Sequence, residues 1–194
     1  WIQGQRLVEI GDRQLHLYYF QLMGRNDGKP VPALVCIHGG GWFAGDPSLF
    51  FPHIRYFASR GLATFSVQYR LTSEPGVTIA DCIEDCKSAI RFIRLNAERF
   101  GVDPNRIAVL GDSAGGHLAA CMGVMDEFDS PREDKNVSSA ANAMILYNPV
   151  VDFADPQLLK YVPDRPLSGA PGLSHVEIAR RIAPLFRVKP GQPP

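Results

Sequence analysis

The sequence lacks an excess of charge of either sign, a long hydrophobic run and any C-x-x-C cysteine pair. Lys plus Arg and Asp plus Glu each number 20, so no net charge attracts nucleic acid or an anionic membrane. No apolar run approaches the length of a membrane span. Because there is no C-x-x-C pair and no two histidines have metal-ligand spacing, we expect no metal site, and buried thiols at Cys36, Cys82, Cys86 and Cys121.

The sequence has the composition of a folded domain. It contains 194 residues, of which 45% are hydrophobic, so it can bury a core and is expected to form one domain over 1–194. Apolar or alternating runs rich in β-formers predict strands, and apolar residues three and four apart predict helices. The predicted strands are 6–10, 14–20, 33–38, 62–69, 107–110 and 143–150, and the predicted helices are 48–59, 79–100, one from 114 onward, and 175–186.

The clearest helix follows Thr78. One apolar stripe is predicted from residues at steps of three and four, namely Ile79, Ile83, Cys86, Ile90, Ile93 and Ala97. Thr78 with Asp81 three residues later is typical of a capping box, and Gly101 is a stop signal. Strands that alternate with helices predict an α/β fold with a mostly parallel central sheet and helices on both faces. Ligands bind at the carboxyl ends of the strands in such sheets.

The segment Gly111-Asp112-Ser113-Ala114-Gly115 matches the pattern G-x-S-x-G between a predicted strand and a predicted helix. In that setting the serine lies on a sharp turn that exposes its hydroxyl, and the small neighbours let the chain turn and a substrate approach. The start of the helix offers free N–H groups to developing negative charge. Ser113 is therefore the candidate nucleophile.

Three consecutive glycines in His38-Gly39-Gly40-Gly41-Trp42 follow a predicted strand directly. Such a loop leaves its backbone N–H groups free to bind the oxyanion of a tetrahedral intermediate. The dinucleotide pattern G-x-G-x-x-A also fits from Gly39 to Ala44. We set it aside because bulky residues stand where a pyrophosphate would lie and because no acid occurs between Asp46 and Glu74.

The two motifs HGGGW and GDSAGG, in this order, resemble those of the hormone-sensitive-lipase-like branch of the α/β-hydrolases, which contains carboxylesterases and acetyl esterases. Tyr69-Arg70-Leu71 and the segment 102–107 are similar to further family segments. The resemblance implies an α/β-hydrolase fold, no cofactor, and Ser113 as nucleophile. It also implies an oxyanion hole formed by the N–H groups of Gly40, Gly41 and Ala114.

The family's catalytic acid and histidine follow the nucleophile on later loops, and we expect them beyond Pro194, with the last strands of the fold. Asp152 and His175 occur in the right order, but we expect a turn cap and the first turn of a helix, respectively. His117 lies one helical turn after Ser113, and we expect it to pack beneath the helix. His38 is expected to brace the glycine loop.

The resulting expectation is a serine carboxylic-ester hydrolase of the acetyl-esterase type, which acts on short-chain acyl esters through an acyl-serine intermediate. Trp42 and Phe43 are expected to line its substrate site, and the Pro-rich segment 152–174 to cover it in part. Two alternatives stay open: a catalytically inactive ligand-binding module on the same fold, and an amide or formamide hydrolase. A parallel sheet that ends early exposes a strand edge, so a homo-oligomer is also possible.

Overall fold

The computed structural model describes residues 2–10, 13–21, 28–153, 155–159 and 172–194, with side chains from residue 15 onward. The elements of the fold, in chain order, are β1 Ile2–Ile10, β2 Arg13–Gln21, β3 Val31–Ile37, the 3-10 helix η1 Pro47–Phe50, α1 Phe51–Ala58, β4 Ala63–Val67, α2 Ile79–Leu95, α3 Ala97–Phe100, β5 Val102–Asp112, α4 Ala114–Val124, β6 Ala143–Tyr147, α5 Pro156–Leu159, α6 His175–Ile182 and the 3-10 helix η2 Pro184–Arg187.

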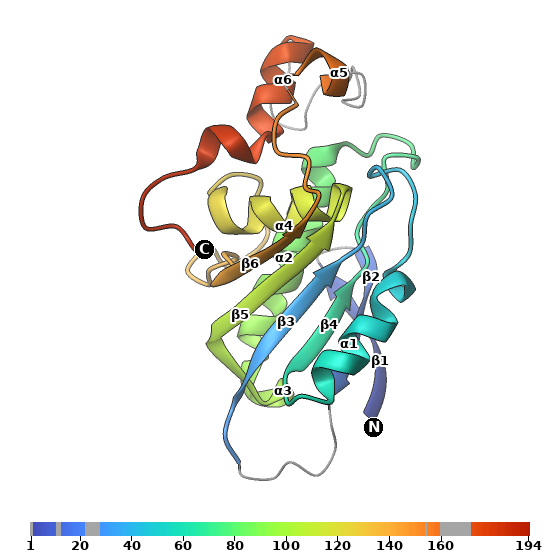
Figure 1. The fold of residues 1–194 in the computed structure, drawn as a ribbon, viewed down its shortest axis with the longest axis vertical. Helices are drawn as coiled ribbons and strands as arrows, with labels where there is room; N and C mark the ends of the chain where they lie inside the picture. The colour runs from blue at the N-terminus through green and yellow to red at the C-terminus, as the bar shows by residue number, and fades with distance from the viewer. Residues whose placement is uncertain (1, 11–12, 22–27, 154, 160–171) are drawn as a thin grey trace.

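The strands form one sheet in the order β1-β2-β4-β3-β5-β6 (Figure 1). Strands β4, β3, β5 and β6 are parallel, and the β1-β2 hairpin joins β4 in antiparallel orientation. This is the mostly parallel α/β sheet that the alternation of predicted elements indicated. The carboxyl ends of the parallel strands therefore meet at one edge, and α5 and α6 lie beyond that edge (Figure 1).

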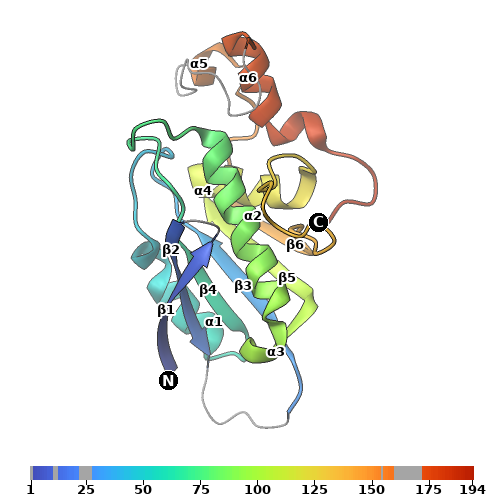
Figure 2. The same ribbon diagram turned by 180° about the vertical axis from the view of Figure 1, so that it is seen from behind.

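Helices cover both faces of the sheet. Helix α1 lies on the face seen in Figure 1, where Phe50, Ile54 and Ala58 pack on Leu34 and Leu110. Helices α2 and α4 lie on the opposite face (Figure 2) and belong to the larger core. The predicted stripe of α2 is confirmed, since Ile79, Ile83, Cys86, Ile90 and Ile93 are all buried there. The four cysteines are free and buried, as expected.

Several predicted bounds are corrected by the fold. Strand β5 begins at Val102, earlier than the predicted strand 107–110. The carboxylate of Asp103 accepts from Asn105 N–H at 2.9 Å, and the pairing with β3 shifts register in this part of the strand. The predicted last helix stops at Ile182 because Pro184 cannot continue it, and a 3-10 turn follows. The predicted long helix divides near Asn96 into α2 and α3.

Strand β6 lies at one end of the sheet and pairs with β5. Beyond that ladder, Met144 N–H donates to the carbonyl of Pro194 at 2.8 Å. Ile145 and Tyr147 are 38% and 54% exposed. One face of β6 is therefore incompletely covered in the described part of the chain, while the outer backbone edge of the strand is bound by Pro194 at Met144. No helix within the described ranges is both long enough and apolar enough to cross a bilayer.

Candidate active site

The register of the sheet brings the two motifs together. Ile37 at the end of β3 lies opposite Gly111 near the end of β5, in parallel strands. The glycine loop that begins at His38 and the turn at Ser113 therefore leave the same edge of the sheet side by side. That edge is the one where ligands bind in α/β sheets.

Ser113 occupies a sharp, strained turn between β5 and α4. Its φ of 50° is in the left-handed region, which a non-glycine residue rarely adopts. The side chain is exposed although every residue of α4 that follows it is buried. A Cβ at Gly111 or Gly115 would lie 2.1 Å from a carbonyl oxygen of the neighbouring backbone, so only glycine permits this tight turn.

The glycine loop presents free backbone donors. Gly40 and Gly41 have φ values of +116° and +63°. A Cβ on Gly40 would lie 2.1 Å from the carbonyl oxygen of Ala44. The Ala44 N–H donates to the carbonyl of Gly40 at 3.0 Å and so closes the loop. Within the described residues, no protein acceptor binds the N–H groups of Gly40 and Gly41. Ala114 begins α4, so its N–H has no partner within the helix.

Asp112 connects the glycine loop to the turn that carries Ser113. The sequence patterns did not predict this connection. The Asp112 Oδ1 accepts from Gly39 N–H at 2.8 Å, and a Cβ on Gly39 would lie 2.6 Å from Oδ2. The first glycine is therefore required by the close approach of this carboxylate. The signal in the sequence was an acidic residue next to the candidate nucleophile, just after a predicted strand.

His38 braces the loop as expected. Its Nδ1 lies 2.7 Å from the carbonyl of Gly39, and its ring stacks on Tyr69 at 4.4 Å between centroids. The Tyr69 hydroxyl donates to the carbonyl of His38 at 2.8 Å. Burial lowers the pKa of His38 and raises that of Tyr69, so both side chains stay neutral at neutral pH.

Of the two aromatic residues expected to line the site, only Phe43 is exposed. It is 58% exposed, whereas Trp42 is 3% exposed. The Trp42 ring packs against Phe153 at 5.2 Å between centroids, and its indole N–H donates to Nδ1 of His117 at 3.1 Å. Trp42 therefore supports the loop from the core, because its indole N–H has a buried acceptor. No local pattern in the sequence indicates that acceptor.

His117 packs beneath α4, as expected, and is fully buried. Its Nε2 lies 2.8 Å from the carbonyl of Ile182, so both ring nitrogens are engaged. Burial lowers the pKa of His117 to about 4. His175 begins α6, in agreement with the expected helix start, and Asp152 lies half-buried after β6. The expected cover at 152–174 falls largely outside the described residues.

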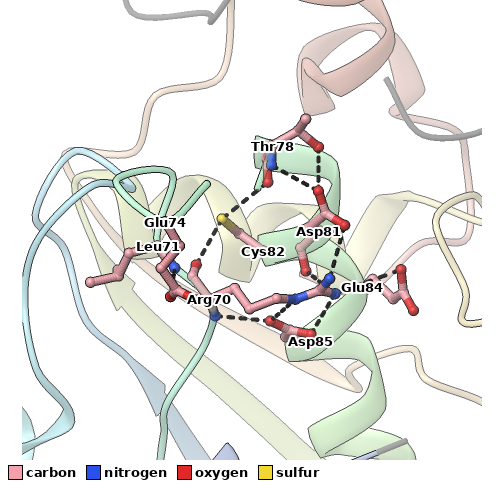
Figure 3. A network of polar contacts seen from close by, with 8 residues as sticks. All are labelled: Arg70, Leu71, Glu74, Thr78, Asp81, Cys82, Glu84 and Asp85. Carbon is pink, nitrogen blue, oxygen red and sulfur yellow. Dashed lines mark hydrogen bonds and ion pairs between the residues drawn. The ribbon is translucent and has the colours of Figure 1, made fainter. Parts of the chain in front are cut away.

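A polar network fixes the chain segment that follows β4 (Figure 3). The buried guanidinium of Arg70 binds Asp85 at 2.7 Å and Asp81 at 2.9 Å, both on α2. Two residues later, Thr72 N–H donates to the carbonyl of Trp42 at 2.8 Å. The glycine loop is thereby connected to α2. In the described part of the chain, no three His, Cys, Asp or Glu side chains gather as a metal site would require.

Comparison with known proteins gives a consistent result. The family model BD-FAE matches residues 21–194. Isoprenylcysteine alpha-carbonyl methylesterase ICME of Arabidopsis thaliana is 36% identical over 120 residues, which cover 61% of this chain and 27% of that protein. Esterase LipC of Mycobacterium tuberculosis is 29% identical over 183 residues, 86% of this chain and 43% of that protein. The chain thus spans less than half the length of these curated relatives.

Solved structures extend the likeness to the whole chain. The esterase 2 of Thermogutta terrifontis phosphonylated by sarin superposes with a TM-score of 0.84 at 36% identity, over 99% of this chain and 70% of that one. The same esterase with butyrate bound gives a TM-score of 0.83 at 36% identity, over 99% of this chain and 69% of that one.

Proposed function

Because this chain belongs to the BD-FAE family and has the α/β-hydrolase fold, we propose that it is a serine carboxylic-ester hydrolase with Ser113 as its nucleophile. The observation that carries the proposal is the exposed, strained Ser113 beside a glycine loop whose N–H groups at Gly40 and Gly41 are free. We also propose that residues 1–194 belong to a single domain. The relatives named as esterases and methylesterases support the same reaction class.

In the proposed reaction a general base takes the hydroxyl proton of Ser113 as its Oγ attacks the ester carbonyl carbon, and the carbonyl oxygen becomes an oxyanion. The N–H groups of Gly40, Gly41 and Ala114 donate to that oxyanion, and such donors act at the moment when charge develops. The tetrahedral intermediate collapses by expelling the alcohol, which takes up that proton, and an acyl-serine remains. Water then hydrolyses the acyl-serine to the free acid and restores the Ser113 hydroxyl. The general base is not His117, since both of its nitrogens are bound within the core.

The proposed substrates are esters of short acyl groups, of the acetyl-esterase type. The esterase of Thermogutta terrifontis has been solved with propionate bound and with butyrate bound, which supports a short acyl site in a close structural relative. Phe43 stands exposed in the glycine loop and is the aromatic residue we propose to contact substrate. Trp42 is left out of that role because its ring is buried.

The test combines covalent labelling with hydrolysis of p-nitrophenyl acetate, butyrate and laurate. We expect one fluorophosphonate adduct on Ser113 and faster turnover of acetate and butyrate than of laurate. Ser113→Ala should abolish the adduct and lower kcat by on the order of 10⁴-fold or more. Ser59→Ala is the matched control, because Ser59 is an exposed serine outside the site whose hydroxyl bonds to the carbonyl of Tyr56.

Other outcomes separate the alternatives. An adduct at another residue, or none, contradicts the assignment of Ser113, and saturable ester binding without turnover would point to an inactive binding module. Faster cleavage of a matched anilide than of the ester would indicate an amide hydrolase. Faster turnover of laurate would overturn the short-acyl preference alone.

A further inference from the structure

His117 joins three parts of the molecule through one buried imidazole. It lies one helical turn after Ser113, and its backbone N–H donates to the carbonyl of Ser113 at 3.0 Å. Its Nδ1 accepts from the Trp42 indole in the glycine loop at 3.1 Å. Its Nε2 is 2.8 Å from the carbonyl of Ile182 at the end of α6. These parts are separated by 75 and 65 residues of sequence, so the imidazole is a long-range connection.

The partners fix the tautomer of this ring. An indole N–H only donates and a peptide carbonyl only accepts, so Nδ1 is the acceptor and Nε2 carries the proton. The sulfur of Cys121, 3.3 Å from Nε2, is compatible with that arrangement. A doubly protonated ring would set two N–H groups against each other at Trp42. The neutral ring is thus the form that satisfies all of its partners.

Trp42 is the point at which the glycine loop is held. It follows Gly40 and Gly41 directly and has a φ of 64°, which a bulky residue keeps only under constraint. Its carbonyl is bound by Thr72 N–H at 2.8 Å, and its side chain is bound by His117. Without the indole bond, one of the loop's fixed points beside the nucleophile helix would be lost.

Two side-chain bonds therefore connect the glycine loop to the short segment that carries Ser113. Gly39 is bound to Asp112, one residue before the serine, and Trp42 is bound to His117, four residues after it. The free N–H groups lie between these two attachments in the loop, and Ser113 lies between them in the turn. This double attachment sets the separation of the N–H donors from the serine hydroxyl.

We infer that His117 is a positioning residue, which holds the oxyanion loop in register with Ser113 and couples both to helix α6. The inference rests on the proposed ester-hydrolase function. It assigns the geometry of the oxyanion loop in part to a residue that does not contact substrate. Ile178, Ala179 and Ile182 of α6 are buried in the same core. The packing position of α6 is consequently connected to the geometry of the glycine loop.

The test uses Trp42→Phe, His117→Phe and the double variant. Trp42→Phe keeps an aromatic ring but removes the indole N–H donor together with part of the ring's buried volume. We expect each variant to lower kcat for p-nitrophenyl butyrate by about 10–100-fold with KM within about twofold, because a displaced donor weakens the transition state rather than substrate binding. The double variant should lose little more than either single one, since both break the same bond.

A spectroscopic measurement reads the bond without catalysis. The chain contains two tryptophans, Trp1 and Trp42, so a Trp1→Phe background leaves a single indole N–H signal in a proton–nitrogen correlation spectrum. We expect that signal to be protected from solvent exchange and to lose its protection in His117→Phe. His117→Gln, which keeps polar groups that can donate and accept, should restore part of both kcat and protection.

The outcomes distinguish the two proposals. Wild-type protein that no fluorophosphonate labels would overturn the ester-hydrolase function, and the positioning role with it. Labelled wild type together with variants of unchanged kcat, or with fully additive losses, would overturn the positioning role alone. Loss of thermal stability at unchanged kcat per labelled site would assign His117 a purely structural role and would also overturn the inference.

Discussion

Strands β4 and β6 are both five residues long, and each has a parallel neighbour, β3 for β4 and β5 for β6, yet they differ in how they are covered. All five residues of β4 are buried between β2 and β3, whereas those of β6 are half-buried or exposed. The sequence of β6, AMILY, is nevertheless the more apolar of the two; β4 reads ATFSV. Apolar composition alone therefore does not decide which strand is covered.

The polar residues of β4 show what does decide it. The hydroxyl of Thr64 donates toward carbonyls of Phe20 and Ile54 at 3.0 Å each, and that of Ser66 donates to Pro47 at 2.8 Å. A buried hydroxyl costs little when it is hydrogen-bonded. Strand β4 is thus surrounded by elements that satisfy its polar groups, and β6 exposes large apolar side chains instead.

The largest expected effect contrasts one side chain from each strand. Phe65 in β4 is fully buried and stacks on Tyr19 at 4.9 Å, so Phe65→Ala should lower the free energy of unfolding by about 3–5 kcal/mol. Ile145 in β6 is 38% exposed, so Ile145→Ala should cost about 1 kcal/mol or less. Urea unfolding of both variants measures the two losses. Similar losses would mean that β6 is covered in solution and would break the comparison.

A smaller effect is expected at two carboxylates. Asp85 binds Arg70 beyond the end of β4 (Figure 3), and its side chain is 6% exposed. Asp85→Asn should cost about 2–3 kcal/mol, because Arg70 keeps Asp81 but loses its buried partner. Asp126 binds Lys189 in the C-terminal tail with side chains 88% and 64% exposed, so Asp126→Asn should cost no more than about 0.5 kcal/mol.

Thermal or urea unfolding at low and high salt checks that second contrast. The loss in Asp85→Asn should persist at high salt because the pair is shielded from ions, while any loss in Asp126→Asn should vanish. Equal salt sensitivity of the two variants would show that Arg70 is hydrated in solution and that the network in Figure 3 is not a buried anchor.

Local patterns predicted the mostly parallel sheet, the α2 stripe and the position of each motif directly after a strand, because periodicity and turn chemistry act over a few residues. The pairing of Ile37 with Gly111 follows from parallel strands that carry both motifs at their ends. The position of Trp42 did not follow. Its indole binds an imidazole 75 residues away, and no local pattern reports such a partner.

The same limit explains the other differences. Asp112 was read only as a motif position, since its bond to Gly39 depends on the register of two strands. The exposure of β6 depends on which other elements pack against the strand, and the local sequence AMILY does not indicate them. Periodicity describes one face of one element, whereas each of these features belongs to a pair of elements.

The remaining expected effect is one of pH and concerns His117, whose helix α4 packs on β6 and whose ring reaches the glycine loop next to β3. Burial lowers its pKa from 6.5 to about 4. Between these values the unfolded chain binds a proton that the folded chain excludes, so stability falls as pH decreases from 6.5 towards 4. This group alone should contribute a slope of about 1 kcal/mol per pH unit.

Urea unfolding of wild type and His117→Gln from pH 7 to 4.5 isolates this contribution as a difference in slope. His38, whose pKa burial also lowers, acts in the same direction in both proteins and cancels. Asp129, whose pKa is lowered from 3.8, loses its contribution only below that range. Equal slopes would mean that water reaches His117 in solution. Water would then reach the core that packs on β6 as well as the exposed side chains of β6, and β6 would differ from the buried β4 on both of its faces.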